Sequence, residues 1–366
     1  MSVRQQFAAL AIFILGVASA ARSEEPQARP QRLAPPGDGK LYHGVYPGGK
    51  SGEEDDITRA DLAGYEKNVQ RQVAWVYFSH NWFREREFPL KTARWIRDAG
   101  AVPYIRLMLR SDAEEDHAEE LFTLQAIAAG KFDADLKKWA EQAREFATPL
   151  LVEWGTECNG EWFPWNGVWN GSREGDAKAE GPRRFVAAYR HLVDTFHKAG
   201  ARNISWVFHV NSADVPKDDW NRLENYYPGD AYVDWLAVSV YGPKTPADAD
   251  REAKPFARQM EKVYSRLVKL APEKPVIVAE FGCTAGHERV SPEDWASAAL
   301  EELLSRRWPK VAGFSWWNER WENGRRREAT TMRVQDIPAL AQVFRAKLNE
   351  AKEKIQDRPI NTPAEK

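Results

Sequence analysis

Short apolar runs alternate with longer amphipathic segments along most of the chain. The apolar runs are rich in Val, Ile and aromatic residues and are bounded by turn residues, which is typical of buried strands. They predict eight strands, at residues 41–46, 73–78, 102–109, 150–157, 204–211, 235–241, 275–282 and 311–318.

Between these runs, apolar residues recur three or four positions apart, which is the spacing of a helix that buries one face. The pattern predicts helices at residues 59–70, 89–99, 134–146, 182–199, 255–270, 292–306 and 337–352. Several begin at Pro or just after Thr, Asp or Ser, and one ends at Gly200, as helix termini require. The interval after the fifth strand holds only residues 216–227, so we expect an irregular connection there.

Strands that alternate with helices pair in parallel through right-handed crossovers. Eight such units predict an α/β fold, a single closed (β/α)₈ TIM barrel, whose chemistry lies where the strands meet their following loops. An open, doubly wound sheet is the alternative. The sequence has no Gly-rich phosphate loop to support it.

The amino terminus has the pattern of a secretory signal. Arg4 is followed by an apolar stretch over residues 7–17 and by the small residues 18–20. We therefore expect a periplasmic or extracellular protein, cleaved near Ala20, without stable membrane insertion, because the apolar stretch is short for a span. A retained signal anchor is the alternative. The predicted division of the chain is a signal peptide at 1–20, a disordered tether at 21–40, the catalytic barrel at 41–352 and a polar tail at 353–366.

Charge and cysteine usage exclude several classes of protein. The 52 Lys and Arg residues nearly balance the 54 Asp and Glu residues, so we expect no nucleic-acid partner. Cys158 and Cys283 are the only cysteines. We expect two buried thiols, with a disulfide between them as the alternative. Neither zinc-type spacing nor an EF-hand is present, so we expect no cofactor and no metal, and we interpret the acidic runs 53–56 and 114–120 as solvated loop charges.

Two glutamates stand at the carboxyl ends of predicted strands. Glu157 ends the fourth strand and Glu280 ends the seventh. Strand alternation places Glu157 on the face of Glu153, and Glu280 on the face of Val278, so both carboxylates should point to the barrel mouth. Two such carboxylates suit cleavage of a glycosidic bond, which needs one proton donor and one carboxylate across the sugar. For either glutamate alone, a solvated or ion-paired carboxylate is the alternative.

Five stretches in order resemble glycoside hydrolase family 26, which includes β-mannanases and related β-glucanases and xylanases. They are AAGKFDADLKKWAEQAREFATPLLVEWGTECNGEWFPWNG, FVAAYRHLVDTFHKAGARNISWVFHVN, YYPGDAYVDWLAVSVYG, KPVIVAEFG and GFSWWNERW. The resemblance implies a retaining hydrolase on a (β/α)₈ barrel. It also implies that Glu157 is the acid/base and Glu280 the nucleophile, and that the phenol of Tyr241 lies against Glu280 and holds it ionised.

Aromatic and polar residues near these glutamates are candidates for substrate binding, since aromatic faces bind the apolar faces of pyranose rings. The resemblance favours Trp162, whereas packing over the barrel end is the alternative for the whole aromatic loop. Alternation permits only one of two adjacent tryptophans to face inward, and we favour Trp317, with Trp316 packed outside. The predicted substrate-binding residues are Trp162, Trp165, Trp317, His209, Asn211 and His80.

The chain departs from the family pattern around the acid/base. Family members typically carry His before it and Met after it, where this chain has Thr156 and Cys158, and Arg four residues earlier, where this chain has Glu153. An added anion would raise the cost of ionising nearby carboxylates. We therefore predict a compensating buried pair between Glu153 and Arg106 of the third strand.

The function that these patterns predict is a monomeric, exported, retaining endo-β-glycanase that hydrolyses a β-linked polysaccharide of the mannan or β-glucan type. One alternative is a hydrolase of the same mechanism for an unusual exopolysaccharide, motivated by Thr156, Glu153 and the long connection 111–131. The other alternative is a catalytically inactive glycan-binding barrel. The intact pair of glutamates argues against it.

Overall fold

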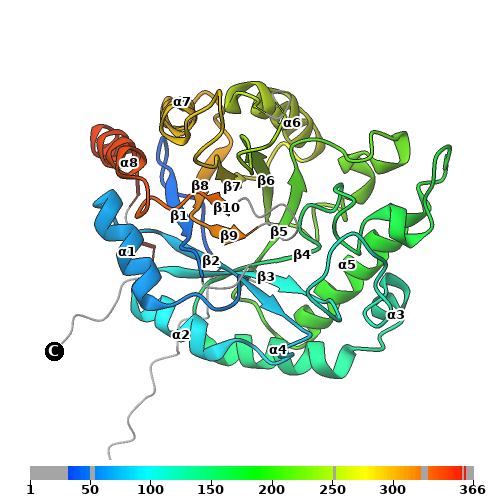
Figure 1. The fold of residues 1–366 in the computed structure, drawn as a ribbon. Coiled ribbons are helices and arrows are strands. Elements are labelled where there is room, and N and C mark those ends of the chain that lie inside the picture. Colours follow the sequence, from blue (N-terminus) through cyan, green and yellow to red (C-terminus); the bar gives the residue numbers. More distant parts are fainter. Residues whose placement is uncertain (1–31, 50–53, 250–252, 323–328, 357, 360–366) are drawn as a thin grey trace, which may run out of the picture.

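A computed structural model describes residues 32–49, 54–249, 253–322, 329–356 and 358–359. Eight parallel strands pair in sequence order, and the eighth pairs with the first to close a barrel (Figure 1). The strands are β1 (Tyr42–Tyr46), β2 (Trp75–Asn81), β3 (Val102–Met108), β4 (Leu150–Trp154), β5 (Ile204–Asn211), β6 (Trp235–Tyr241), β7 (Val276–Gly282) and β8 (Val311–Trp317). The predicted (β/α)₈ barrel is confirmed.

Helices surround this barrel (Figure 1). They are α1 (Arg59–Val69), α2 (Leu90–Asp98), α3 (Leu124–Ala128), α4 (Asp133–Phe146), α5 (Glu180–Lys198), α6 (Phe256–Leu270), α7 (Pro292–Leu304) and α8 (Pro338–Glu350). Sequence signals fix their starts: Thr58 and Asp61 form a capping box at α1, and the Ser291 hydroxyl caps α7. After β5 the connection contains only the 3₁₀ turns Asp219–Asn221 and Leu223–Tyr226, as predicted.

Three short elements escaped the sequence analysis. The helix α3 has five residues, and it lies in the long connection between β3 and β4. The strands β9 (Arg320–Glu322) and β10 (Ala329–Thr331) pair antiparallel directly after β8. Segments of this length are too short to show a hydrophobic period.

A tryptophan fills the barrel near the amino ends of the strands. Trp75 of β2 packs over Gly44 and Gly313, and its indole N–H donates to Ser315 Oγ at 2.6 Å. A Cβ at Gly44 would lie 2.0 Å from Trp75 Nε1, and one at Gly313 would lie 2.2 Å from the Trp75 ring. Only glycine leaves room for this ring. The polar side chains of the barrel interior therefore gather toward the opposite end, the mouth.

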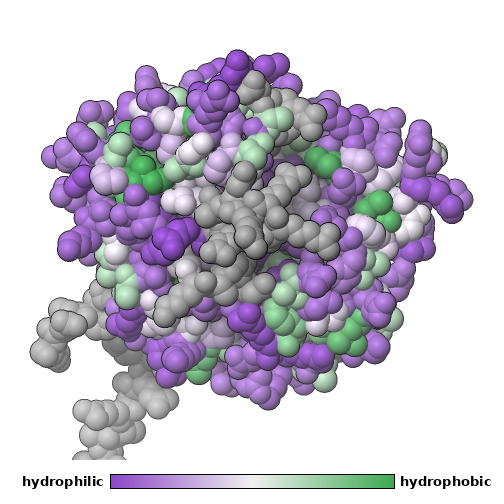
Figure 2. Space-filling view, in the orientation of Figure 1, coloured by the Kyte–Doolittle hydropathy of each residue, from purple (hydrophilic) through white to green (hydrophobic). Residues whose placement is uncertain are grey.

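The packed body extends beyond the predicted barrel boundaries at 41 and 352. Leu33 and Ile355 are buried, and Ile355 forms an isolated parallel bridge with Leu41. The predicted signal peptide at 1–20 lies outside the described residues. Within the part of the chain that the structure covers, no helix is long and apolar enough to cross a membrane. The face in Figure 2 is mainly hydrophilic, with small apolar spots.

Both cysteines are buried free thiols, as predicted. Cys158 follows the turn after β4, and Cys283 follows β7. Burial raises the pKa of the Cys158 thiol well above its ordinary value and that of Cys283 to about 12. Both thiols are therefore unreactive at neutral pH.

Candidate active site

Glu157 reaches the barrel mouth through a turn instead of the predicted strand end. Strand β4 ends at Trp154, and Gly155 and Glu157 take left-handed backbone conformations, with φ of +72° and +47°.

 The predicted alternation of Glu153 and Glu157 on one strand face was therefore wrong, because left-handed residues break the pleat. A left-handed backbone is rare for a residue other than glycine and is concentrated at functional sites.

Glu280 faces the barrel interior because β7 contains a bulge. Val278 pairs with Val238 and Glu280 pairs with Ser239, so Ala279 is left without a partner between them. Paired residues of parallel strands share a face, which puts Glu280 on the inner face with Ser239 and leaves Val278 on the outer face. The predicted alternation of Val278 and Glu280 was wrong, although the predicted inward direction of Glu280 is confirmed.

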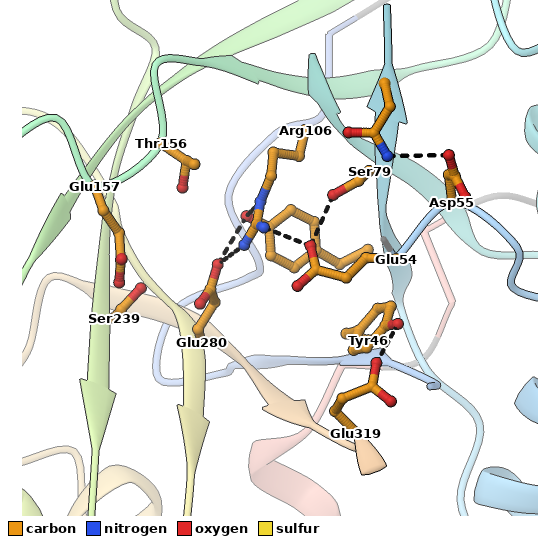
Figure 3. A network of polar contacts seen from close by, with 12 residues as sticks. Tyr46, Glu54, Asp55, Ser79, Arg106, Thr156, Glu157, Ser239, Glu280 and Glu319 are labelled. Carbon is orange, nitrogen blue, oxygen red and sulfur yellow. Dashed lines mark hydrogen bonds and ion pairs between the residues drawn. The ribbon is translucent and has the colours of Figure 1, made fainter. Parts of the chain in front are cut away.

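Glu280 lies close enough to Glu157 to affect the ionisation of Glu157. Figure 3 shows Glu157 and Glu280 at the mouth, with Ser239 beside them. Both are buried, with 8% and 4% of their surfaces exposed. Burial raises the pKa of Glu157, and the nearby charge of Glu280 raises it further. When two adjacent carboxyls cannot both ionise freely, one keeps its proton and the other becomes the carboxylate.

Glu280 is surrounded by donors. The Arg106 guanidinium of β3 forms an ion pair with Glu280 Oε1, and the Tyr77 hydroxyl of β2 donates to the same oxygen at 3.2 Å. The Tyr241 hydroxyl of β6 donates to Glu280 Oε2 at 2.9 Å, which is the contact predicted from the sequence. A cation and two phenols therefore stabilise the ionised form of Glu280.

Glu157 has weaker, neutral donors. The Trp162 indole N–H donates to Glu157 Oε2 at 2.7 Å. The charge of His209 and a hydrogen bond from Ser239 each lower the pKa of Glu157 and so partly offset its rise. No ion pair to Glu157 is present among the described side chains. The carboxyl group therefore retains its proton more readily than an ordinary glutamate.

The predicted buried pair of Arg106 and Glu153 is confirmed, with Arg106 Nε 3.6 Å from Glu153 Oε1. Arg106 makes closer contacts elsewhere, and Glu153 receives hydrogen bonds from the Tyr77 hydroxyl and, at 2.7 Å, from the Tyr104 hydroxyl. Burial alone would raise the pKa of Glu153, but His209 and Arg106 hold that pKa at about 2. Glu153 is therefore a fixed anion beneath the mouth.

The sequence analysis missed a third carboxylate at the mouth of the barrel. Glu54 lies in the acidic run that we interpreted as solvated loop charges, yet its Oε2 is 2.5 Å from Arg106 Nη1 and accepts from Ser79 Oγ at 2.8 Å (Figure 3). Burial, partly offset by Arg106, raises the pKa of Glu54 to about 7. The interpretation was wrong for Glu54, because strand partners distant in the sequence desolvate it.

The predicted aromatic contacts divide into two groups. Trp317 faces inward, stacked on Tyr46 with ring centroids 4.2 Å apart, and Trp162 is only partly buried beside Glu157. Trp165 is instead a packing residue, because it is 2% exposed, stacks on Phe163 and donates to a backbone carbonyl. Its predicted substrate contact does not agree with this geometry.

The predicted polar contacts fit less well. His80 points away from the mouth toward α4, where its Nδ1 accepts from the Trp139 indole at 3.3 Å. His209 is inward but 1% exposed, with both ring nitrogens in contact with protein groups. Asn211 is partly exposed at the end of β5, and its amide donates to the Ala213 carbonyl. Packing from other elements thus removes His80 and His209 from direct reach of a substrate.

The fold and the site together define a class of protein. It is a (β/α)₈ barrel with two carboxyl groups at its mouth, one in the turn after β4 and the other near the carboxyl end of β7. Among the described residues, no group of three or more His, Cys, Asp or Glu side chains could hold a metal ion. Residues 112–286 match the sequence model of glycosyl hydrolase family 26. The resemblance to this family that was predicted from the sequence is therefore confirmed over this segment of the chain.

Relatives agree with this assignment. Endoglucanase H of Acetivibrio thermocellus is 27% identical over 220 residues, which cover 60% of this chain and 22% of that protein. The mannan endo-1,4-beta-mannosidase A and B of Caldalkalibacillus mannanilyticus is 28% identical over 45% of this chain and 27% of its own length. The matched region thus spans about a quarter of these curated relatives. The solved Bacillus subtilis mannanase BCman shares the fold, with a TM-score of 0.61, 15% identity and 88% coverage of both chains.

Proposed function

We propose that this protein is a retaining endo-β-glycanase that hydrolyses a β-linked polysaccharide of the mannan or β-glucan type. The observation that supports this most strongly is the contrast between the two facing carboxyls. Glu280 contacts a cation and two phenols, whereas the pKa of Glu157 is raised by burial and by Glu280. A retaining mechanism requires this division into an ionised nucleophile and a protonated acid.

In the first step, the Glu280 carboxylate attacks the anomeric carbon as the bond from that carbon to the leaving oxygen breaks. Glu157 gives its proton to the leaving oxygen, so the leaving sugar departs as a neutral alcohol. The product is a glycosyl ester of Glu280. Glu157 is now a carboxylate, and the Trp162 indole N–H donates to it.

In the second step, Glu157 takes a proton from a water molecule whose oxygen attacks the anomeric carbon. The ester bond breaks and Glu280 leaves as a carboxylate, where Arg106 and Tyr241 stabilise the returning charge. The anomeric carbon is inverted twice, so the product keeps the β configuration.

A partly exposed tryptophan at the mouth supports a sugar-chain substrate. Trp162 lies beside the proposed acid and Trp317 beside Arg106, whose guanidinium carbon is 5.1 Å from the Trp317 ring. The partly exposed Trp162 ring can stack on a sugar, whereas Trp317 is 3% exposed and stacks on Tyr46, so it can form at most the floor beneath a sugar. The names of the relatives, an endoglucanase and an endo-mannosidase, favour β-glucan and mannan as the first substrates to test.

We also propose that the protein is exported and acts as a monomer outside the cytoplasm. Residues 1–20 have the composition of a secretory signal, and a polysaccharide is too large to enter a cell intact. Amino-terminal sequencing of the secreted protein should give a start near residue 21. An intact amino terminus on a cell-bound protein would contradict export.

The proposed function is tested by following hydrolysis of β-mannan, mixed-linkage β-glucan and β-1,3-xylan by proton NMR. The expected result is cleavage of at least one polymer into oligosaccharides, with the β-anomer appearing first. Initial appearance of the α-anomer would overturn the retaining mechanism. Binding of these polymers without any cleavage would favour the inactive glycan-binding barrel.

A further inference from the structure

A buried line of polar side chains crosses the barrel beneath the proposed acid/base. His209 of β5 lies between two partners: its Nδ1 is 3.0 Å from Glu153 Oε2, and its Nε2 is 2.8 Å from Ser239 Oγ. Thr156 Oγ1 also lies 2.9 Å from His209 Nδ1. Glu153, His209 and Ser239 are each at most 1% exposed, so water does not compete for these contacts.

The line continues to Glu157 through Ser239, whose hydroxyl lies beside the Glu157 carboxyl (Figure 3), and hydrogen bonding by Ser239 lowers the pKa of Glu157. A hydroxyl has a single hydrogen to donate. When His209 Nε2–H donates to Ser239 Oγ, the hydroxyl hydrogen is left to point at Glu157. The anion Glu153 favours this arrangement, because it stabilises the imidazolium form of His209, which carries one proton on the Nδ1 that faces Glu153 and the other on Nε2.

We propose that Glu153, His209 and Ser239 form a positioning relay that directs one hydrogen-bond donor at Glu157 and so sets the strength of the acid/base. The inference deepens the proposed function and rests on it. The three residues do not touch the reacting atoms. They act through Ser239 on the carboxyl that gives up a proton in the first step and takes one in the second.

The charges facing the relay agree with this role. Glu153 and Glu280 favour the protonated form of His209, and the net effect is a raised pKa of His209 despite its burial. Glu157 faces Glu280, which raises its pKa, and His209, Ser239 and Lys244, which lower it. Loss of the relay should therefore raise the pKa of Glu157 and make it a weaker acid.

Ser239→Ala is the test, because it removes only the hydroxyl. The expected kcat/KM on the polysaccharide falls by about tenfold, as for one hydrogen bond to a charged group. The basic limb of the pH profile should move upward by about one pH unit. An aryl glycoside whose leaving group needs no proton should keep its kcat/KM. Ser205→Ala makes the same change at a buried serine of the neighbouring strand β5 and should alter neither the kcat/KM on the polysaccharide nor the pH profile.

A measurement without substrate separates the relay from the proposed function. In protein labelled with ¹³C at the glutamate carboxyls, the Glu157 signal is assigned by its absence in Glu157→Gln, and its pKa is read from a titration. The pKa should rise in Ser239→Ala and in His209→Asn, which loses the contact to Ser239. An unchanged pKa overturns the relay even if the enzyme is active. A shifted pKa without turnover in the parent protein overturns the proposed function alone.

Discussion

Glu157 and Glu280 are the same residue type at the same end of one barrel, yet their surroundings differ. Glu280 contacts the Arg106 guanidinium and two phenols, whereas the direct donors to Glu157 are an indole and a hydroxyl. Other strands supply these donors except for the Trp162 indole, which lies in the loop after β4, so the difference arises from the surroundings of the two glutamates. The comparison teaches that the surrounding side chains decide which glutamate is the proton donor and which is the nucleophile. Replacing the glutamates and their neighbours one at a time tests this.

The largest expected effect is on the Glu280 side. Glu280→Ala removes the group that forms the covalent intermediate, so cleavage of both polysaccharides and activated aryl glycosides should fall by at least about 10⁴-fold. Reducing-sugar and aryl-alcohol release measure the two rates. Glu273→Ala, the same change at an exposed position, should leave both rates unchanged. Persistent aryl glycoside cleavage in Glu280→Ala would show that another group is the nucleophile.

The Glu157 side should respond selectively. In Glu157→Ala, kcat/KM for the polysaccharide should fall by about 10²–10⁴-fold, the usual contribution of general acid catalysis. An aryl glycoside with an acidic phenol leaves without a proton, so its kcat/KM should be nearly preserved. Steady-state kinetics on both substrates give this ratio. Equal losses on the two substrates would remove Glu157 from the role of acid.

The cation beside Glu280 should also matter for stability. Arg106 is buried against Glu54, Glu153 and Glu280, so Arg106→Met leaves three carboxyls without their cation and should cost about 3–5 kcal/mol of unfolding free energy at pH 7. Arg106 lowers the pKa of Glu54 and that of Glu153, so without the cation these two pKa values rise in the folded state. The deficit should therefore grow as the pH rises above about 4.5 and shrink in acid.

Urea unfolding followed by tryptophan fluorescence measures this cost. Arg84→Met is the matched control, because the Arg84 side chain is 47% exposed in its pair with Asp55 and should contribute at most about 1 kcal/mol. An Arg106→Met protein as stable as Arg84→Met would show that the carboxyls are stabilised by other donors.

The smallest expected effect comes from a carboxyl outside both proposed roles. Glu319 accepts from the Tyr46 hydroxyl at 2.5 Å, and burial raises its pKa from 4.5 to about 7. Because the folded state holds this proton more tightly, the parent protein loses stability as the pH rises from about 4.5 to about 7. Glu319→Gln has no carboxyl to ionise. Its unfolding free energy relative to that of the parent protein should therefore rise by about 1–3 kcal/mol between pH 5 and pH 8. An equal difference at both pH values would contradict the raised pKa.

The fold was largely predictable because long buried strands keep a clear apolar pattern. The predicted bounds of the fifth and sixth strands coincide with β5 and β6. The five-residue α3 and the three-residue β9 and β10 were missed, since so few residues show no period. The local pattern of apolar and polar residues was therefore enough to predict the strands and long helices that form the barrel.

The site was less predictable because its backbone departs from regular strand geometry. The sequence indicated Glu157 and Glu280, but not the left-handed turn or the bulge that aims them. Likewise, His80 and Trp165 resembled mouth residues until partners from other elements covered them. Glu54 became significant only through Arg106, which is distant in the sequence. Such partners cannot be read from the local pattern.

The bulge at Ala279 limits how this site could be transplanted. In a straight strand with the same sequence, the inward position two residues after Ile277 would belong to Ala279, and the Glu280 carboxylate would turn into the helical layer. A methyl group would then face the sugar. Any scaffold that borrows this catalytic strand must therefore inherit its irregularity along with its residues.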